Sequence, residues 1–369
     1  MTAAKQRTTR RSSDSVLLAE RVLRHQAAWR VLGDWESRFL ARRLAAVPID
    51  RPVFIAGLAR AGTTILLRKL CESGGFTSHR YADFPFLFTP YAWALLRRLA
   101  PERPQAPRER MHQDRITVTP ESPEAMEEVL WMAFLPHLHD PRRSNVLDRS
   151  DHEPAFEAFL ADHIRKLLLA RGGRRYVSKN NYNLSRLGYL GRVFPDARFL
   201  LPVRAPAAHV ASLMKQHALF SRIQHDSELA RRHLRLIGHF EFGLDRRPIN
   251  PGDGDAVAGI ERCWRQGEEA RGWAQYWALA YRHVLDRLET DPGLTGRCLL
   301  VRYEDLCDRP VQTLSAVCAH IGLSGARARG LADGLSQPRY YAPQFSDQER
   351  AAIAEETAAV AQRLGYGGS

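Results

Sequence analysis

Short apolar runs alternate along this chain with longer segments in which apolar residues recur at helical spacing. The short runs have the length of buried strands and cover residues 53–56, 176–179, 198–203 and 297–301. The longer segments predict helices over residues 63–71, 91–99, 122–135, 156–170, 184–194, 206–220, 268–288 and 310–321. A last helix is predicted after Ser346, because Ser346 and Glu349 have the spacing of a capping box. This alternation predicts an α/β fold whose central sheet is mainly parallel and covered on both faces.

The first 46 residues differ from the rest of the chain. Residues 1–13 are basic, contain no acidic residue and lack the apolar stretch of a secretory signal. They predict a disordered tail, with an organelle transit peptide as the alternative. Residues 14–46 predict an N-terminal helical arm that packs on the core, with apolar positions at Val16, Leu17, Val22, Leu23, Trp29, Leu32, Trp35 and Leu40.

Residues 47–369 are expected to form one α/β domain with insertions near 79–150 and 217–262. The part of the second insertion from residue 221 to 262 is first charged and then glycine-rich. We interpret it as an insertion or lid over the sheet. These two insertions are the segments expected to shape a substrate pocket.

The most informative stretch joins the first predicted strand to the helix after it. Gly57 and Gly62 bracket a four-residue loop, and the helix begins at Thr63. Such a loop directs backbone N–H groups and a helix N-terminus at an anion. Glycine allows phosphate oxygens to approach the backbone amides closely. The pattern therefore predicts a three-layer, P-loop-like fold with an anion site; the alternative is a glycine-rich turn without a ligand.

This loop differs from the loop that binds nucleoside triphosphates. In the triphosphate loop a lysine follows the second glycine, whereas Thr63 stands here. The cation lies inside the loop instead, at Arg60, next to the hydroxyls of Thr63 and Thr64. A planar guanidinium beside two hydroxyls suits a small oxyanion such as a phosphosulfate better than a magnesium triphosphate.

The stretch Phe54-Ile-Ala-Gly-Leu-Ala-Arg-Ala-Gly-Thr-Thr64 resembles the 5′-phosphosulfate loop of sulfotransferases that use 3′-phosphoadenosine 5′-phosphosulfate (PAPS). It is most similar to the tyrosylprotein and bacterial carbohydrate branches, whose loop carries arginine. The resemblance implies that PAPS is the co-substrate and that the loop binds it through Arg60, Ala61, Gly62, Thr63 and Thr64. Ala61 departs from the family pattern, which has serine there.

A second anion clamp is predicted where the strand over residues 198–203 ends. Arg204 follows this strand, and Ser212 lies in the next helix. Ligands of such sheets bind beyond the carboxyl ends of the strands, although an arginine there can also be merely solvated. In the sulfotransferases that the chain resembles, an arginine and a serine at this interval bind the 3′-phosphate of PAPS. The segment from Val301 to Leu306 also resembles the family, which implies that Tyr303 lies near the nucleotide.

The resemblance further implies a catalytic role for Lys179, which follows the strand over residues 176–179 and would stabilise the transferring group. A surface lysine is the alternative. Sulfuryl transfer also needs a base that takes the proton of the acceptor. Asp83 is our choice, because related enzymes with an arginine loop place a carboxylate in the segment after the loop helix. A turn cap is the structural alternative for Asp83, and His79 and His112 are the alternative bases.

Composition limits the partners. The net charge of +13 favours anionic ligands, but the basic residues are not interleaved with aromatic residues, so nucleic acid is not the expected partner. The five cysteines form no C-x-x-C pair and predict reduced thiols in the cytoplasm. No apolar run is long enough to span a membrane. His137 and His139 invite a metal interpretation, but no third ligand has the usual spacing, so a polar loop is preferred.

The sequence thus predicts a PAPS-dependent sulfotransferase that acts on a hydroxyl or amine of a carbohydrate, lipid or small molecule. No metal is expected, because the transferred group carries little net charge. A homodimer is possible. The alternatives are a P-loop nucleotide kinase and a non-enzymatic protein that binds a nucleotide or nucleic acid.

Overall fold

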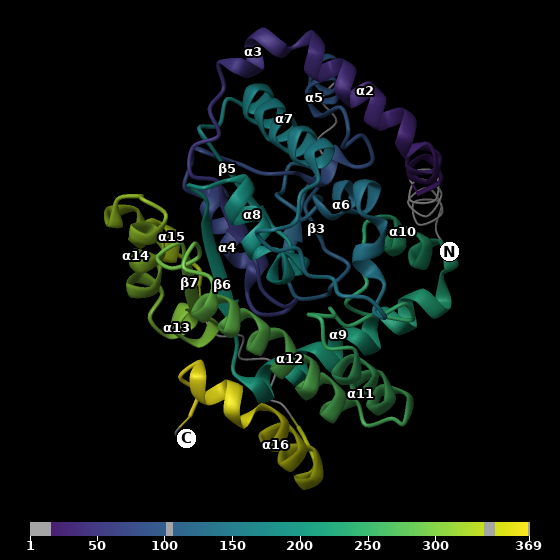
Figure 1. Cartoon of the computed structure of the whole chain (residues 1–369), viewed down its shortest axis with the longest axis vertical. Helices are drawn as coiled ribbons and strands as arrows, with labels where there is room; N and C mark the ends of the chain where they lie inside the picture. Colours follow the sequence, from purple (N-terminus) through teal and green to yellow (C-terminus); the bar gives the residue numbers. More distant parts are fainter. Residues whose placement is uncertain (1–15, 101–105, 336–343, 368–369) are drawn as a thin grey trace.

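The computed structural model describes residues 16–100, 106–335 and 344–367 of the chain. Its elements form an α/β fold with a mainly parallel central sheet, as the sequence predicts (Figure 1). The predicted basic tail, residues 1–13, lies outside the described residues. None of the described helices is both long and apolar enough to span a membrane.

Five parallel strands form the central sheet in the order β2–β5–β1–β6–β7. The central strand β1 (Val53–Ile55) lies between β5 (Arg175–Lys179) and β6 (Arg198–Val203). The edge strands are β2 (Phe76–Thr77) and β7 (Cys298–Arg302). The four predicted strands are all present. Strand β2 was not predicted, because two residues are too few to show a periodic pattern.

Alternate residues of β1 supply two different cores, which makes the fold three-layered. Val53 and Ile55 face a cluster with α4 (Thr63–Glu72) and α14 (Pro310–His320). Phe54 points to the other face, where the larger core includes side chains of α7, α8 and α12. These helices span Pro154–Arg171, Leu187–Val193 and Glu269–Thr290.

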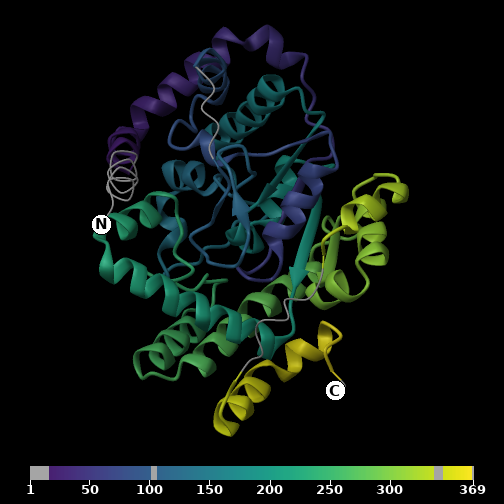
Figure 2. The same ribbon diagram turned by 180° about the vertical axis from the view of Figure 1, so that it is seen from behind.

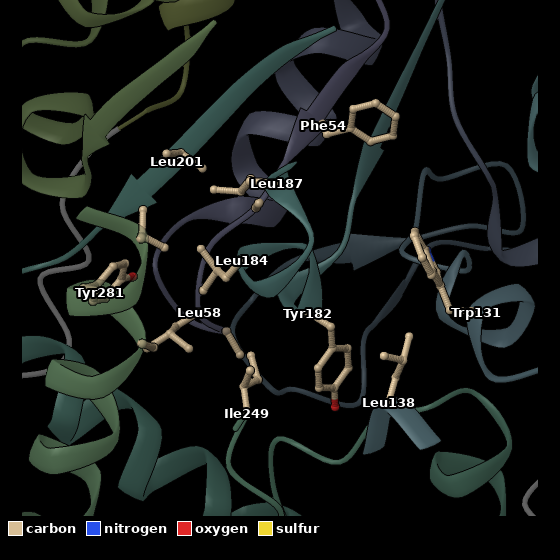
Figure 3. Close-up of a cluster of buried hydrophobic side chains, with 14 of the residues drawn as sticks. Phe54, Leu58, Trp131, Leu138, Tyr182, Leu184, Leu187, Leu201, Ile249 and Tyr281 are labelled. Atoms are coloured by element: carbon tan, nitrogen blue, oxygen red, sulfur yellow. The ribbon is translucent and has the colours of Figure 1, made fainter. Parts of the chain in front are cut away.

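The larger core also fixes the loop that follows β1. Figure 3 shows Leu58, inside this loop, close to Tyr281 of α12 and Leu184. Leu58 is almost completely buried. The Tyr281 hydroxyl donates a hydrogen bond of 3.2 Å to the carbonyl of Pro202 in β6. The packing therefore ties the loop to the end of the neighbouring strand.

One predicted helix begins later in the structure than expected, and the second predicted insertion contains regular helices. Helix α6 spans Glu128–Phe134 and begins later than the predicted start at residue 122. The residues before it are extended: Pro123 forms a bridge with Arg80, and the amide of Glu124 donates to the carbonyl of His79. The segment over residues 221–262, interpreted as an insertion or lid, is mostly regular helix: α9 continues from Pro206 to Asp226 and is followed by α10 (Glu228–Leu236) and α11 (Gly254–Arg265).

The remaining elements lie around this frame. A short antiparallel hairpin consists of β3 (Arg108–Glu109) and β4 (Thr117–Val118). The other α-helices with defined bounds are α2 (Gln26–Phe39), α3 (Ala41–Ala45), α5 (Pro90–Leu99), α13 (Tyr303–Asp308), α15 (Ala328–Ala332) and α16 (Asp347–Arg363), of which α16 begins with the predicted capping box. Single 3-10 turns cover Tyr81–Asp83, Pro136–His139, Asn181–Ser185 and Gly325–Arg327.

The N-terminal arm is helical, but it packs differently from the prediction. It consists of a helix over residues 16–24, then α2 and α3, and it runs along the outside of the molecule (Figures 1 and 2). Val22 and Leu40 are buried as expected. Leu32 and Trp35 were predicted to pack on the core, yet they are 49% and 66% exposed. The helical spacing was correct, but it does not distinguish an inward from an outward apolar face.

Candidate active site

The loop between β1 and α4 has a backbone that requires glycine. Gly62 has a φ of +97°, and a Cβ built on it would lie 2.9 Å from the ring of Tyr303. Arg60 also has a positive φ, +75°, which is uncommon for a residue with a side chain. The loop leads directly into the N-terminus of α4 at Thr63. Strained backbone at the start of a helix is the geometry that suits an anion site.

Arg204 joins this loop from the end of β6. Its Nη1 donates to the carbonyl of Arg60 at 3.3 Å, and its guanidinium carbon lies 4.7 Å from the centre of the Tyr303 ring. The Nε of Arg204 is buried and has no hydrogen-bond partner among the residues that the structure describes. A buried N–H without a partner is costly, so this donor is suited to a ligand oxygen.

Ser212, in the second turn of α9, meets the loop as well. The Nε of Arg60 donates to its Oγ at 3.3 Å. Another residue of α9, His209, makes a ring-nitrogen contact of 2.8 Å with the carbonyl of Ala59. In the sequence, Arg60 of the loop and Arg204 are 144 residues apart, whereas in the structure they are hydrogen-bonded and belong to one surface.

A third segment covers the loop. The turn of the β3–β4 hairpin places Asp114 between two guanidiniums, 2.7 Å from Arg60 and 2.5 Å from Arg110. Arg110 also donates to the Oγ1 of Thr64 at 3.3 Å. Burial alone would raise the pKa of Asp114, but the two arginines outweigh burial and hold that pKa well below its usual range. Asp114 therefore carries its negative charge next to the loop.

Lys179 lies at the carboxyl end of β5, with its Nζ 3.9 Å from an oxygen of Glu124. Burial lowers the pKa of Lys179, and the charge of Glu124 offsets only part of this effect. Burial would raise the pKa of Glu124, but Lys179, Arg110 and a hydrogen bond from Tyr81 keep it below the usual value. Glu124 is therefore an ionised carboxylate beside the lysine.

Asp83 lies in a different environment. One of its oxygens accepts from Arg171 at 2.5 Å, and the other accepts from the backbone N–H of Arg80 at 2.7 Å. The second bond caps the turn over Tyr81–Asp83. The structure thus shows for Asp83 the turn cap that was its structural alternative, together with a buried ion pair. Neither of these partners belongs to the loop.

The two histidines named as alternative bases also have partners. His79 is buried, its Nε2 lies 2.7 Å from that of His163, and burial lowers its pKa to about 4. His112 lies in the hairpin turn, with its Nε2 3.4 Å from that of His239. Burial and the nearby charge of Arg110 hold the pKa of His112 well below 6.5. Of the two, His112 is the one on the segment that covers the loop.

Some predicted residues keep their amides or side chains engaged elsewhere. The backbone N–H of Ala61 donates to the carbonyl of Leu58, so it closes the loop. Thr63 is buried, whereas Thr64 is reached by Arg110.

Within the described part of the chain no group of three or more histidine, cysteine, aspartate or glutamate residues could hold a metal ion. His139, one of the two histidines considered for a metal, contacts Glu128 at 2.6 Å.

Sequence reasoning missed three residues: Arg110, Asp114 and Glu124. Arg110 and Asp114 are four residues apart, a spacing that permits an ion pair, but nothing local shows that the pair covers the loop. Glu124 lies in the predicted helix over residues 122–135, whose pattern does not indicate a site residue. The chemistry of the assembled site is that of an anion cradle, with Arg60, Arg110, Arg204 and Lys179 as its cations.

Comparisons with known proteins agree with this geometry. The model of a family described as the sulfotransferase family matches residues 52–245, which include the loop, Lys179 and the Arg204–Ser212 clamp. No curated protein matches the chain.

Bacterial sulfotransferases are among the solved structures that match this chain. Sulfotransferase STF9 from Mycobacterium avium has a TM-score of 0.52 and 15% identity, over 89% of this chain and 81% of that chain. Sulfotransferase STF1 from Mycobacterium tuberculosis has a TM-score of 0.47 and 17% identity, over 94% and 92% of the two chains. A sulfotransferase from Alicyclobacillus acidocaldarius has a TM-score of 0.40 and 17% identity, over 86% and 97%.

Proposed function

Because this chain belongs to the sulfotransferase family, we propose that it transfers a sulfuryl group from PAPS to a hydroxyl or amine acceptor. One observation carries the proposal for the donor. Arg60, Ser212 and Arg204 make one hydrogen-bonded surface at the carboxyl end of β1 and β6. A nucleotide with phosphates at both its 5′ and 3′ positions needs two such neighbouring clamps.

The residues present fit such a donor. The Nε of Arg204 is a buried hydrogen-bond donor without a partner among the described residues. Gly62 has no side chain, and a Cβ there would lie 2.9 Å from the Tyr303 ring. In the proposed complex, Arg60 and Thr64 bind the 5′ side, while Arg204 and Ser212 bind the 3′-phosphate. Tyr303, stacked on Arg204, borders the nucleotide. Ala61, Gly62 and Thr63 form the loop and helix start around the 5′ group.

PAPS supplies an activated sulfuryl group whose transfer leaves adenosine 3′,5′-bisphosphate. The work of the chain is to neutralise the negative charge that grows on the 5′-phosphate oxygens. Arg60 and Arg110 are the cations at the loop, and the N-terminus of α4 adds a partial positive charge. Lys179, at the end of the adjacent strand, stabilises the transferring group.

Two carboxylates compete for the role of general base. We propose Glu124, because it is ionised and lies 3.9 Å from Lys179, which brings a proton acceptor to the place where the sulfuryl group passes. Asp83, the choice from the sequence, has Arg171 and the amide of Arg80 as partners. Both carboxylates are paired, but Glu124 faces Lys179 of the site at 3.9 Å, whereas both oxygens of Asp83 are engaged at 2.5 and 2.7 Å by partners outside the loop. Asp83 and His112 remain the alternatives that the same variants test.

Asp114 occupies the position of an anion against Arg60 and Arg110. A donor that binds the same guanidiniums has to replace this carboxylate. The β3–β4 hairpin would therefore shift when the donor binds, since Asp114 lies in its turn.

A nucleotide kinase is less well supported. In the P-loop of kinases a lysine stands at the position of Thr63, and Thr63 is only 3% exposed here.

The acceptor, which we expect to be a carbohydrate, lipid or small molecule, would bind between the two insertions. We further propose a cytoplasmic location, supported by five cysteines that are all free, and one catalytic domain over residues 47–369. A homodimer remains a prediction.

The activity is tested with sulfur-labelled PAPS and pooled glycans, lipids, phenols and peptides. We expect label on at least one acceptor class, together with release of adenosine 3′,5′-bisphosphate. The Arg60→Gln variant serves as the inactive control. If phosphate from MgATP labels an acceptor while PAPS is left intact, the proposal is wrong and the kinase alternative holds.

A further inference from the structure

A stripe of apolar side chains on α2 points away from the protein. Val31, Leu32, Trp35 and Phe39 recur at the spacing of one helix face, and they are 53%, 49%, 66% and 89% exposed. An isolated exposed apolar residue needs no explanation, but a contiguous patch that includes tryptophan and phenylalanine does. We call these four residues the α2 stripe.

The orientation of α2 is fixed by polar contacts on its opposite side. The carbonyl of Gly33 accepts a hydrogen bond of 2.6 Å from Lys166 of α7, and Glu36 pairs with the same lysine at 3.2 Å. Glu36 also accepts from the backbone N–H of Ala92 in α5 at 2.6 Å. A Cβ on Gly33 would lie 2.6 Å from the carbonyl of Phe88, so the helix is in close contact there. The α2 stripe therefore cannot rotate inward without breaking a buried ion pair.

The neighbouring helix α5 enlarges the apolar surface. The start of α5 meets the N-terminal arm: the backbone N–H of Ala92 donates to Glu36 of α2, and Arg43 of α3 donates to the hydroxyl of Tyr91. Leu95, Leu96 and Leu99 of α5 are 49%, 59% and 76% exposed. The exposed leucines of α5 thus add apolar surface on the helix whose start contacts α2.

The exposed charges around the stripe are mainly positive, and Asp34 is the exposed acid among them. Residues 21–43 contain six arginines and two acids, and one of these acids is Glu36, which is buried against Lys166. Arg24, Arg38 and Arg42 are exposed and occupy the ends and one flank of the stripe. An apolar helix face that carries tryptophan and is bordered by arginines matches the interface of an anionic bilayer, where rings sit at headgroup depth and arginines meet lipid phosphates.

We propose that the α2 stripe, with α5, docks this protein onto the surface of an anionic lipid membrane. The docking is peripheral, since no described helix can span a bilayer. A second copy of the chain is a poorer occupant, because a two-fold contact would bring the arginines of both copies together. The proposal does not depend on the identity of the sulfate donor.

The test is co-sedimentation of the full-length protein with vesicles of phosphatidylcholine alone and of phosphatidylcholine with phosphatidylglycerol. We expect binding to the anionic vesicles only. The double variant Trp35→Ser with Phe39→Ser should lower the partition coefficient by about tenfold or more. It removes the apolar side chains that would be buried in the membrane. Arg38→Glu with Arg42→Glu should do the same through charge.

Two matched variants control for general effects. Leu244→Ser with Val311→Ser removes other exposed apolar residues, and Arg262→Glu with Arg265→Glu reverses exposed charges on α11. Both should bind vesicles like the unchanged protein. An equal melting temperature of all variants shows that they are folded.

The proposal is overturned if the unchanged protein does not bind anionic vesicles, or if the α2 variants bind as well as their controls. It is also overturned if light scattering shows a dimer that Trp35→Ser with Phe39→Ser converts to a monomer, because the stripe is then the interface with a second copy.

Discussion

Arg60 is the residue at which the candidate site comes together. Its side chain contacts Ser212 and Asp114, and its carbonyl accepts from Arg204. Its backbone has a positive φ. One residue thus links the loop, α9, the β3–β4 hairpin and the end of β6. A change at any of these partners should therefore alter anion binding.

Removal of the Arg204 side chain should separate the two proposed phosphate clamps. Arg204→Ala should weaken binding of adenosine 3′,5′-bisphosphate by about 2–3 kcal/mol, the scale of a hydrogen bond to a charged group. It should barely affect adenosine 5′-phosphosulfate, which lacks the 3′-phosphate. Isothermal titration of both nucleotides gives the comparison. Equal losses for the two would show that Arg204 does not bind the 3′ group.

Replacement of the two candidate carboxylates should identify the base. Glu124→Gln should lower kcat by about 10²–10⁴-fold with little change in bisphosphate affinity, because it keeps the shape and removes the basicity. Asp83→Asn should mainly lower the melting temperature, because it leaves Arg171 without its buried partner. Activity is measured per folded molecule.

The reverse outcome restores the prediction from the sequence. If Asp83→Asn abolishes turnover in a folded protein while Glu124→Gln keeps it, Asp83 is the base. If both variants remain active and only His112→Gln is inactive, the base is the histidine of the hairpin.

At the scale of elements, the β3–β4 hairpin lies against the loop. Its turn holds Asp114 against two arginines, and the carbonyl of His112 accepts a hydrogen bond of 3.4 Å from Gln216 of α9. Gln113 and Arg115, on either side of Asp114, both have positive φ. The turn is therefore held in place by ionic contacts with the site itself.

Loss of the Asp114 charge should strengthen anion binding. Asp114→Asn should raise the affinity for adenosine 3′,5′-bisphosphate by about tenfold, or about 1.4 kcal/mol, because it removes the carboxylate that competes for Arg60 and Arg110. Calorimetric titration measures the change. Asp245→Asn is the matched control, because Asp245 also pairs with two arginines, Arg231 and Arg235, outside the loop. A weaker affinity in Asp114→Asn would mean that Asp114 orients the arginines for the donor.

The loop and the sheet could be predicted from the sequence because their signals are local. Gly57, Gly62 and the apolar run before them specify a strand, a turn and a helix within about a dozen residues. The fold that follows is confirmed by the strand order. Asp114 has no local signal of its role, because its pairing with Arg60 joins residues 54 positions apart and forms only when the hairpin packs on the loop.

Two other wrong predictions also arise from tertiary contacts that the local sequence does not show. The extended path through Pro123 and Glu124 is set by a bridge to Arg80 and by the carbonyl of His79, so helix signals over residues 122–127 were overridden by a tertiary contact. The outward face of α2 follows from the buried pair of Glu36 with Lys166. A single carboxylate in an apolar helix pattern does not reveal its distant partner.

At the scale of the whole molecule, buried histidines make stability depend on pH. Burial lowers the pKa of several histidines, to about 4 for His79 and about 3 for His209. The others with a lowered pKa are His112, His163, His217, His233, His283 and His320. Because these groups bind protons near pH 6.5 only when the chain unfolds, the unfolded state gains protons first as the pH falls.

The free energy of unfolding should therefore fall between pH 7.5 and pH 5.5, by up to about 1.4 kcal/mol per pH unit for each fully buried histidine. Glu127 opposes this trend below pH 6, since burial raises its pKa to about 6, but it contributes only one proton. Urea denaturation at the two pH values measures the slope. His209→Gln should reduce this slope by the amount that corresponds to about one proton taken up on unfolding. A flat or inverted dependence would contradict the neutral state of the buried histidines.

We propose that Arg60, Ser212 and Arg204 form the site of a 3′-phosphorylated adenylate. The most direct test is the melting temperature of the full-length protein with adenosine 3′,5′-bisphosphate in the presence of EDTA, next to a sample with MgATP. A ligand that binds only the folded state raises the melting temperature. We predict a concentration-dependent increase with the bisphosphate that is lost in Arg204→Ala. An increase with MgATP and none with the bisphosphate would contradict the account.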